Sequence, residues 1–518
     1  MSSAKVHARN LFCNWGAHAA NLVVMFFLSP FLVHTLGPME YGIWSLLWVL
    51  TGYMGILDLG VRASTGRHVI LYLGKEDHEK VDHTIRTGLA FFTLTGGLVI
   101  AIGSLVGWVF PSAFSSVPLK YHGLLKILMP VMALNVWLSA LAAVFSSVII
   151  AHERFDIARG IDIGVLAIRT VGTVFALRWG HGILGLTIVV VVCNVVALFA
   201  NWVVAHRIYR RLRAWPLILS KKRVRELLGY GLAAFISAIA VKIIGQTSLV
   251  VVGAAINVSA VTVFSVGAML IYYSSTFLDH IGWTFFPPVQ RAAARGELGT
   301  MRWLFLRQVR LGMILGLVLN VGFIAFGRPF IRLWMLGPEF PESAVSEAAM
   351  VMAILAGSKL LLLPTIGSNQ LLAATGHIWF TAAIGIIEAG VNLGLSIFFV
   401  LVFEWGLVGV AAGTLVARVL VRTFVLPWYA CRKAGVGWPG FCARIGGPAI
   451  LSGALFAATC LAVRATIRPD SWPMFGISIV LALVCYAPIA FLILVPSADR
   501  TRVYRELARR ARRETPYA

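Results

Sequence analysis

The sequence lacks any polar region long enough to form a separate soluble domain. Only 13% of its 518 residues are charged, whereas 59% are hydrophobic and the mean hydropathy is +0.86. Acidic residues are especially scarce, because 21 Asp and Glu stand against 44 Lys and Arg, which gives a net charge of +23. A chain that is both oily and basic is typical of a membrane protein rather than a soluble one.

Cysteine is also sparse, and the motif of a nucleotide-binding phosphate loop is absent from the sequence. None of the six cysteines forms a C-x-x-C pair, so the pattern predicts neither a disulfide framework nor a metal site. No G-x-x-x-x-G-K-[ST] phosphate loop occurs, so we expect no nucleotide site of that type and no cofactor. The cysteines are Cys13, Cys193, Cys431, Cys442, Cys460 and Cys485.

Long apolar stretches dominate the chain. Fourteen of them have, or approach, the roughly 20 residues that a helix needs to cross a bilayer, which predicts an all-α, polytopic membrane protein. The first opens directly after Lys5 and Arg9 and is too long for a cleavable signal, so we expect it to be retained. The ninth is short and should extend through Trp303 or Trp334. The stretches are 11–34, 41–60, 88–110, 123–150, 160–177, 183–205, 227–255, 258–286, 311–326, 348–366, 378–403, 407–429, 445–463 and 475–495.

The cations are sorted between alternate connections. With fourteen spans both termini share one side, and that side carries 32 Lys and Arg against 6 on the other, with 6 inside spans. The positive-inside rule then predicts that both termini are cytoplasmic. The same sorting argues against nucleic acid as a partner, because the cations lie where they would face anionic phospholipid. The tail at 499–513 has Val503 and Leu507 at helical spacing and either lies on the membrane or is a solvated basic segment.

The longest polar connection, 206–226, divides the chain after the sixth span. This predicts a six-helix bundle at 1–212, a second at 213–435, and two extra spans with a basic tail at 436–518. A short sequence similarity supports repeated halves. Ile-Leu-Asp-Leu-Gly at 56–60 and Phe-Leu-Asp-His-Ile-Gly at 277–282 fall at corresponding positions in the two halves. Repeated halves are the usual plan of secondary transporters, with the substrate site between them.

The opening of the chain resembles a known family. The run 36–44, Leu-Gly-Pro-Met-Glu-Tyr-Gly-Ile-Trp, followed by Leu-Asp-Leu-Gly-Val at 57–61, is similar to the start of bacterial Wzx-type polysaccharide transporters. The loop His-Glu-Arg-Phe-Asp at 152–156 is similar to a feature of the same family. These transporters belong to the multidrug/oligosaccharidyl-lipid/polysaccharide flippase superfamily. The likeness covers the whole chain in span count and its first third in motif.

That resemblance implies a fold and a function. It implies two six-helix bundles around a central cavity in the bacterial cytoplasmic membrane. It also implies transfer of undecaprenyl-pyrophosphate-linked oligosaccharide to the outer leaflet, for O-antigen, capsule or exopolysaccharide. Polysaccharide assembly proteins are then candidate partners. The alternatives within the superfamily are a lipid II flippase and a drug or cation exporter.

Five cations near the middles of spans are candidate substrate ligands. A charged side chain there costs roughly 2.5–3.5 kcal/mol on insertion scales, so it should face a cavity or a partner. Either these residues line a path for a pyrophosphate, whose oxygens Arg binds in a bidentate way, or they form ion pairs that hold helices together. The candidates are Lys242, Arg169, Arg418, Lys359 and Arg422, with Lys242 the first choice; Lys126 lies near a membrane surface and is set aside.

Acidic residues in the spans are fewer. Glu388 and Asp279 are candidates for coupling to a proton or Na⁺, because a buried carboxylate titrates at raised pH. Glu388 could instead pair with Lys359 or Arg418. Asp58, Gly60 and Arg62 form a structural motif at the inner end of the second span, where Asp58 could anchor Arg62 or Arg67.

An enzyme is disfavoured because the outer connections are too short to hold a set of acid–base residues. A cation exporter should place acids in its spans, whereas here six cations face about three acids. The sequence therefore favours an anionic substrate.

Overall fold

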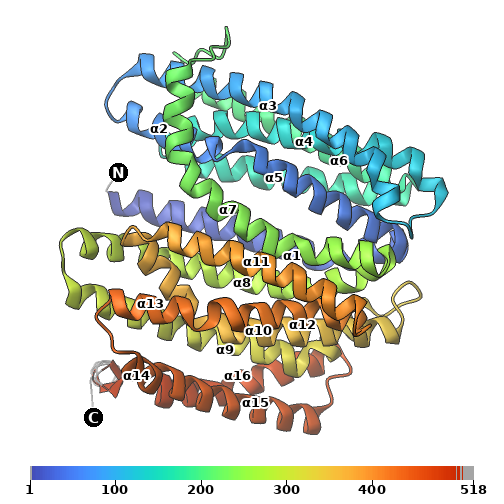
Figure 1. The fold of residues 1–518 in the computed structure, drawn as a ribbon, viewed down its shortest axis with the longest axis vertical. Coiled ribbons are helices and arrows are strands. Elements are labelled where there is room, and N and C mark those ends of the chain that lie inside the picture. The colour runs from blue at the N-terminus through green and yellow to red at the C-terminus, as the bar shows by residue number, and fades with distance from the viewer. Residues whose placement is uncertain (1–2, 498, 502–504, 506–518) are drawn as a thin grey trace, which may run out of the picture. The chain divides into compact units, whose positions relative to one another are not determined.

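The computed structural model describes residues 3–497, 499–501 and 505, and these residues form helices joined by short connections (Figure 1). Within this part of the chain there is no strand beyond an isolated bridge between Gly337 and Phe340. The predicted all-α, polytopic fold is confirmed. Most of the basic tail, Val503 and Leu507 included, lies outside the described residues.

Twelve helices of the described chain are long and apolar enough to cross a membrane. The fourteen predicted spans become twelve for two reasons. The first span and most of the second lie in one helix, α1 (Ser3–Met54), which is interrupted where Gly37 has φ 72° and ψ 170°, and the second continues into η1 (Gly55–Asp58). The seventh lies in α7 (Lys221–Ala255), of which Gly245–Ala255 is a shorter apolar helix. The ninth, α9 (Leu298–Met335), extends through both Trp303 and Trp334.

The chain divides into two compact units. The first unit is Met1–Val263 with Gly337–Phe340, and the second is Phe264–Leu336 with Pro341–Ala518. The division falls within α8 (Val258–Ala294). The three segments predicted from the sequence follow span number rather than compactness and stay a prediction.

In the first unit, α4 packs against α3 and α6, and α5 packs against α6 and α1. Asp77 caps α3 by accepting a hydrogen bond from the Lys80 amide at 3.1 Å. The Lys80 side chain also donates to Asp77, which holds the pKa of this exposed carboxyl below its usual range. The other elements are η1 (Gly55–Asp58), α2 (Val61–Leu73), α3 (His78–Ala113), α4 (Leu119–Ala151), α5 (Phe155–Arg178) and α6 (Gly182–Ile208).

In the second unit, α10 packs against α9 and α12, α11 against α12, and α15 against α16 and α9. Two segments, η2 and η3, are π-helical turns within otherwise α-helical spans. The elements beyond α8 and α9 are α10 (Glu342–Ala374), α11 (Ile378–Leu401), α12 (Gly406–Arg418), η2 (Val419–Thr423), α13 (Val425–Lys433), α14 (Trp438–Phe441), η3 (Cys442–Gly446), α15 (Gly447–Ile467) and α16 (Trp472–Leu494).

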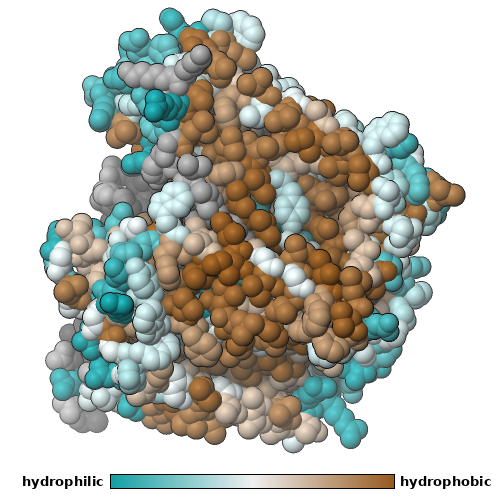
Figure 2. Space-filling view, in the orientation of Figure 1, coloured by the Kyte–Doolittle hydropathy of each residue, from teal (hydrophilic) through white to brown (hydrophobic). Residues whose placement is uncertain are grey.

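Large apolar side chains are exposed along many of these helices. On α3, for example, Leu94 and Leu105 are 66% and 64% exposed. Figure 2 shows apolar side chains gathered in a broad band on the visible face, with hydrophilic residues collected beyond its edges. Exposed apolar surface on this scale suits hydrocarbon rather than water.

Candidate substrate-binding cavity

A cavity of about 310 Å³ lies inside the first unit. Its wall combines three cations, Arg62, Arg169 and Lys242, with the amides of Asn135 and Asn194. Asn194 Nδ2 donates to Asn135 Oδ1 at 3.1 Å, which joins α6 to α4. The described lining contains no carboxylate, so the cavity is electropositive.

Lys242, on α7, reaches the end of α1. Its Nζ donates to the carbonyl oxygen of Gly52 at 2.5 Å. The last carbonyls of a helix lack partners within the helix and carry its negative dipole end, which favours an ammonium there. A Cβ on Gly55 would lie 2.9 Å from this Nζ, so glycine leaves room for the side chain. The hydrogen-bond partner of Lys242 is therefore a neutral carbonyl.

Arg169, on α5, lines the same cavity. Its Nε is buried and has no hydrogen-bond partner among the described residues. A buried donor without an acceptor costs about 1–3 kcal/mol, more for a charged group. Arg169 therefore lines the cavity with a guanidinium that no described residue satisfies at Nε.

The motif at 58–62 supplies the third cation. Gly60 has φ 74°, which favours glycine, and its amide donates to Asp58 Oδ1 at 2.7 Å. This turn starts α2, so that Arg62 Nε lies 3.6 Å from Asp58 Oδ2 and Arg62 Nη2 donates to Ser139 at 3.4 Å. Sequence reasoning treated Arg62 as structural and missed its place on the cavity wall; the signal available was its position one turn from Asp58.

A second hollow, of about 510 Å³, lies between α2 and α4 and shares Arg62 with the cavity. Arg67 also lines it, and its other walls are mostly small or apolar, including Gly66 and Ile70. The arginine side chain of Arg62 therefore borders both spaces.

The remaining candidate cations lie in the second unit, around Glu388. Glu388 is 1% exposed, with Oε1 lying 3.5 Å from Arg418 Nε and Oε2 accepting from Arg422 Nη1 at 3.0 Å. Arg418 also donates to Ser358 Oγ at 2.6 Å, and Arg422 to Asn369 Oδ1 at 3.4 Å. We call Arg418, Glu388 and Arg422 the buried triad. Of the pairings left open by the sequence, the one with Arg418 is present, and Arg422 joins it.

Lys359 and Asp279 lie near this triad without belonging to it. Lys359 has no hydrogen bond or ion pair with any described residue, although it is close enough to Asp279 and Arg418 to interact electrostatically. Asp279 is exposed. The predicted pairing of Glu388 with Lys359 is not present as a contact.

The five candidate cations thus form two groups. Lys242 and Arg169 line one cavity in the first unit, whereas Lys359, Arg418 and Arg422 gather in the second. No group of three or more His, Cys, Asp or Glu that could hold a metal ion occurs in the part of the chain that the structure describes.

Comparison with known proteins places the chain in a family. The family described as lipid II flippase MurJ matches residues 71–485. The chain belongs to the MurJ family. A curated relative, the uncharacterized membrane protein EpsK of Bacillus subtilis (strain 168), is 22% identical over 507 residues, covering 95% of this chain and 96% of EpsK.

Solved structures agree with the MurJ family fold. A lipid II flippase MurJ in an inward closed conformation matches with a TM-score of 0.72 at 14% identity, over 97% of this chain and 100% of that one. An inward-facing multidrug resistance MATE transporter of the MOP superfamily matches with a TM-score of 0.65 at 14% identity, over 80% and 94%. At this identity the likeness establishes the fold alone.

Membership of the MurJ family confirms the coarser prediction, a multi-pass membrane protein of a flippase family rather than of an enzyme family. The Wzx-type assignment within the superfamily stays a prediction.

Proposed function

We propose that the protein flips a polyprenyl-pyrophosphate-linked oligosaccharide across the bacterial cytoplasmic membrane by alternating access, as Wzx-type transporters do. The observation that carries this proposal is the electropositive cavity of the first unit, which Arg62, Arg169 and Lys242 line. A cavity of about 310 Å³ suits a charged headgroup, while a polyprenyl chain would stay in lipid.

Two of the three cations would have distinct roles toward the pyrophosphate. The unpartnered Arg169 donor would bind a phosphate oxygen directly, and a guanidinium suits such oxygens in a bidentate way. Lys242 would exchange its bond to the Gly52 carbonyl for a stronger one to an anion. Asn135 and Asn194 would supply amides for the first sugar.

Lipid II is the second candidate substrate, and the family match favours it. Its headgroup also joins the carrier through a pyrophosphate, so the cationic wall suits both lipids. The two differ in the glycan and peptide beyond the phosphates. A drug or cation exporter is less consistent with a lining that has three cations and no carboxylate.

The orientation belongs to the same proposal. The 32 cations of the predicted inner connections would place both termini in the cytoplasm, with the pyrophosphate loaded from that side.

Two bacterial hosts test the substrate. The gene is expressed in one strain depleted of its lipid II flippase and in another that lacks its polysaccharide flippase. We expect surface glycan to return in the second strain. If only the growth of the first strain were restored, the substrate would be lipid II and not the oligosaccharide.

A binding measurement accompanies the complementation. Native mass spectrometry of the purified protein should show tighter binding of an undecaprenyl-pyrophosphate-linked glycan than of undecaprenyl monophosphate. Equal binding of both lipids, with no complementation in either host, would contradict the proposed function.

A further inference from the structure

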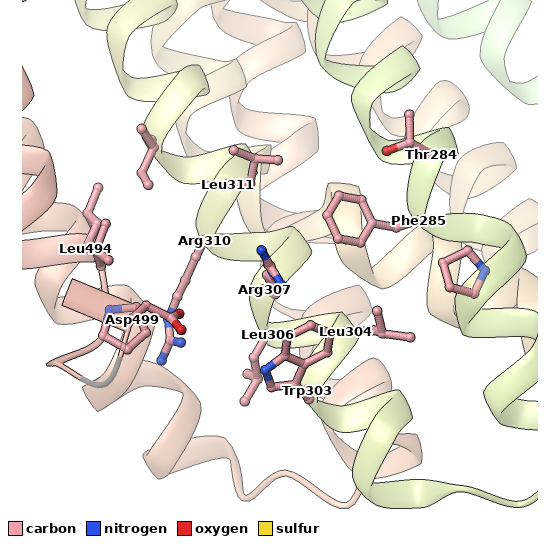
Figure 3. Close-up of a pocket in the computed structure, with 14 residues that line it drawn as sticks. Thr284, Phe285, Trp303, Leu304, Leu306, Arg307, Arg310, Leu311, Leu494 and Asp499 are labelled. Carbon is pink, nitrogen blue, oxygen red and sulfur yellow. The ribbon is translucent and has the colours of Figure 1, made fainter. Parts of the chain in front are cut away.

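A separate cavity of about 470 Å³ lies in the second unit, between α8, α9 and the end of α16 (Figure 3). It shares no lining residue with the cavity of the first unit, and none of the residues of the buried triad lines it. It is therefore separate from the site that we propose for the pyrophosphate.

Two arginines on one face of α9 give the cavity its charge. Arg307 and Arg310 are three residues apart, a spacing that places side chains together on a helix. Neither has a hydrogen bond or ion pair with a described residue, although the Arg307 guanidinium lies 4.8 Å from the centre of the Trp303 ring. Figure 3 shows Arg310 extending toward Asp499, the one acid in the described lining. Arg444 also lies close enough to act on Arg310 electrostatically.

The balance of charge at the cavity is positive. Among the described residues, three arginines act there against one carboxylate, and two of these arginines have donors that no described residue accepts. A phosphate group, with several acceptor oxygens, complements such a pair.

The rest of the wall is apolar. Phe285, Leu311, Ile314 and Leu494 line it alongside the arginines, and Trp303, which is 53% exposed, stands at its edge. Tryptophan is enriched at the level of lipid headgroups, and basic pockets between helices bind anionic headgroups on the cytoplasmic side. The start of α9 belongs to one of the cation-rich connections predicted to be cytoplasmic. Arg295 and Arg302 come just before the lining residues of α9 in the sequence. A ligand that matches this wall has a phosphate at one end and hydrocarbon at the other.

We infer that this cavity is a binding site for an anionic phospholipid of the surrounding leaflet. Arg307 and Arg310 hold the phosphate, Trp303 lies beside the glycerol region, and the acyl chains pack on Leu311, Ile314 and Leu494. The site is independent of the transported substrate, so it stands whether or not the proposed function is right.

Native mass spectrometry of the full-length protein with phosphatidylglycerol tests the site. The double variant Arg307→Gln/Arg310→Gln should bind this lipid at least about tenfold more weakly, because it loses the charge-assisted hydrogen bonds to the phosphate. The matched control is Arg295→Gln/Arg302→Gln, which removes the same charge from the same end of the unit outside the cavity. It should change the affinity by less than about twofold.

Three further ligands test which chemical features of the lipid the cavity recognises. Phosphatidylethanolamine, which has no net charge, should bind equally weakly to all three proteins. Glycerol 3-phosphate should compete poorly, because it lacks acyl chains. Equal losses in both double variants, or full competition by glycerol 3-phosphate, would overturn the proposal. Undecaprenyl monophosphate that bound more tightly than phosphatidylglycerol would assign the cavity to the carrier lipid and overturn it too.

Discussion

Lys242 and Arg169, in the cavity of the first unit, form no ion pair with a described carboxylate, whereas the two arginines of the buried triad in the second unit share one. In the cavity, Lys242 is bonded to a neutral carbonyl, and Arg169 has no hydrogen bond or ion pair with a described residue. In the triad, both oxygens of Glu388 face a guanidinium, and Ser358 and Asn369 take further donors. An intramembrane cation is therefore a candidate ligand when its partners are neutral, and a structural element when a carboxylate already compensates its charge.

The largest effect should come from breaking the triad. Glu388→Gln leaves two buried guanidinium groups uncompensated, so we expect the free energy of unfolding to fall by about 3–5 kcal/mol. Unfolding of the purified protein in detergent measures it. Adding Arg422→Gln restores the original net charge and should recover part of the loss.

Asp279→Asn is the control for the triad, because Asp279 has no ion pair with a described residue. A stable Glu388→Gln protein whose transport no longer depends on a proton or Na⁺ gradient would contradict the structural role. It would support ion coupling at Glu388, the alternative open from the sequence.

An intermediate effect should come from the cavity. Lys242→Gln removes a cation that we place on the pyrophosphate, so transport of the lipid-linked glycan should fall about tenfold or more. Protein abundance in the membrane should not change, because the partner left behind is a carbonyl at a helix end. The matched control is Lys126→Gln, whose ammonium lies over the Trp108 ring at 4.1 Å, away from the cavity. Equal transport by both variants would remove the distinction between the two regions.

The smallest effect should come from Asp58→Asn. The pair with Arg62 is partly exposed at 3.6 Å, and such pairs contribute about 0–1 kcal/mol. The new amide oxygen can still accept from the Gly60 amide, so thermal unfolding should change little. If Asp58→Asn lowered the free energy of unfolding as much as Glu388→Gln, the difference in exposure would not explain the difference between the two carboxylates.

Span positions could be predicted because they depend on local composition. The short ninth stretch needed an extension through Trp303 or Trp334, and α9 includes both. Partner choice could not be predicted, because it depends on how neighbouring helices rotate. Glu388 lies on α11, while its partners come from the end of α12 and from the π-helical η2, whose register the sequence does not reveal.

Arg62 shows a second feature that the sequence predicts only in part. Its spacing from Asp58 predicted an ion pair, and one is present. Its place on the cavity wall depends on α2 leaving η1 through two left-handed residues, Leu59 and Gly60, which redirect the chain. Hydropathy does not encode that change of direction.

Because the Arg62 side chain borders both hollows of the first unit, no substitution there alters only one of them. Shortening it would enlarge and merge two spaces, remove a charge from each, and leave Asp58 without its partner. A defect in Arg62→Ala would therefore have three sources that a single measurement cannot separate. Arg67 and Arg169 each border only one of these two hollows. A substitution of either residue therefore tests the function of that hollow alone.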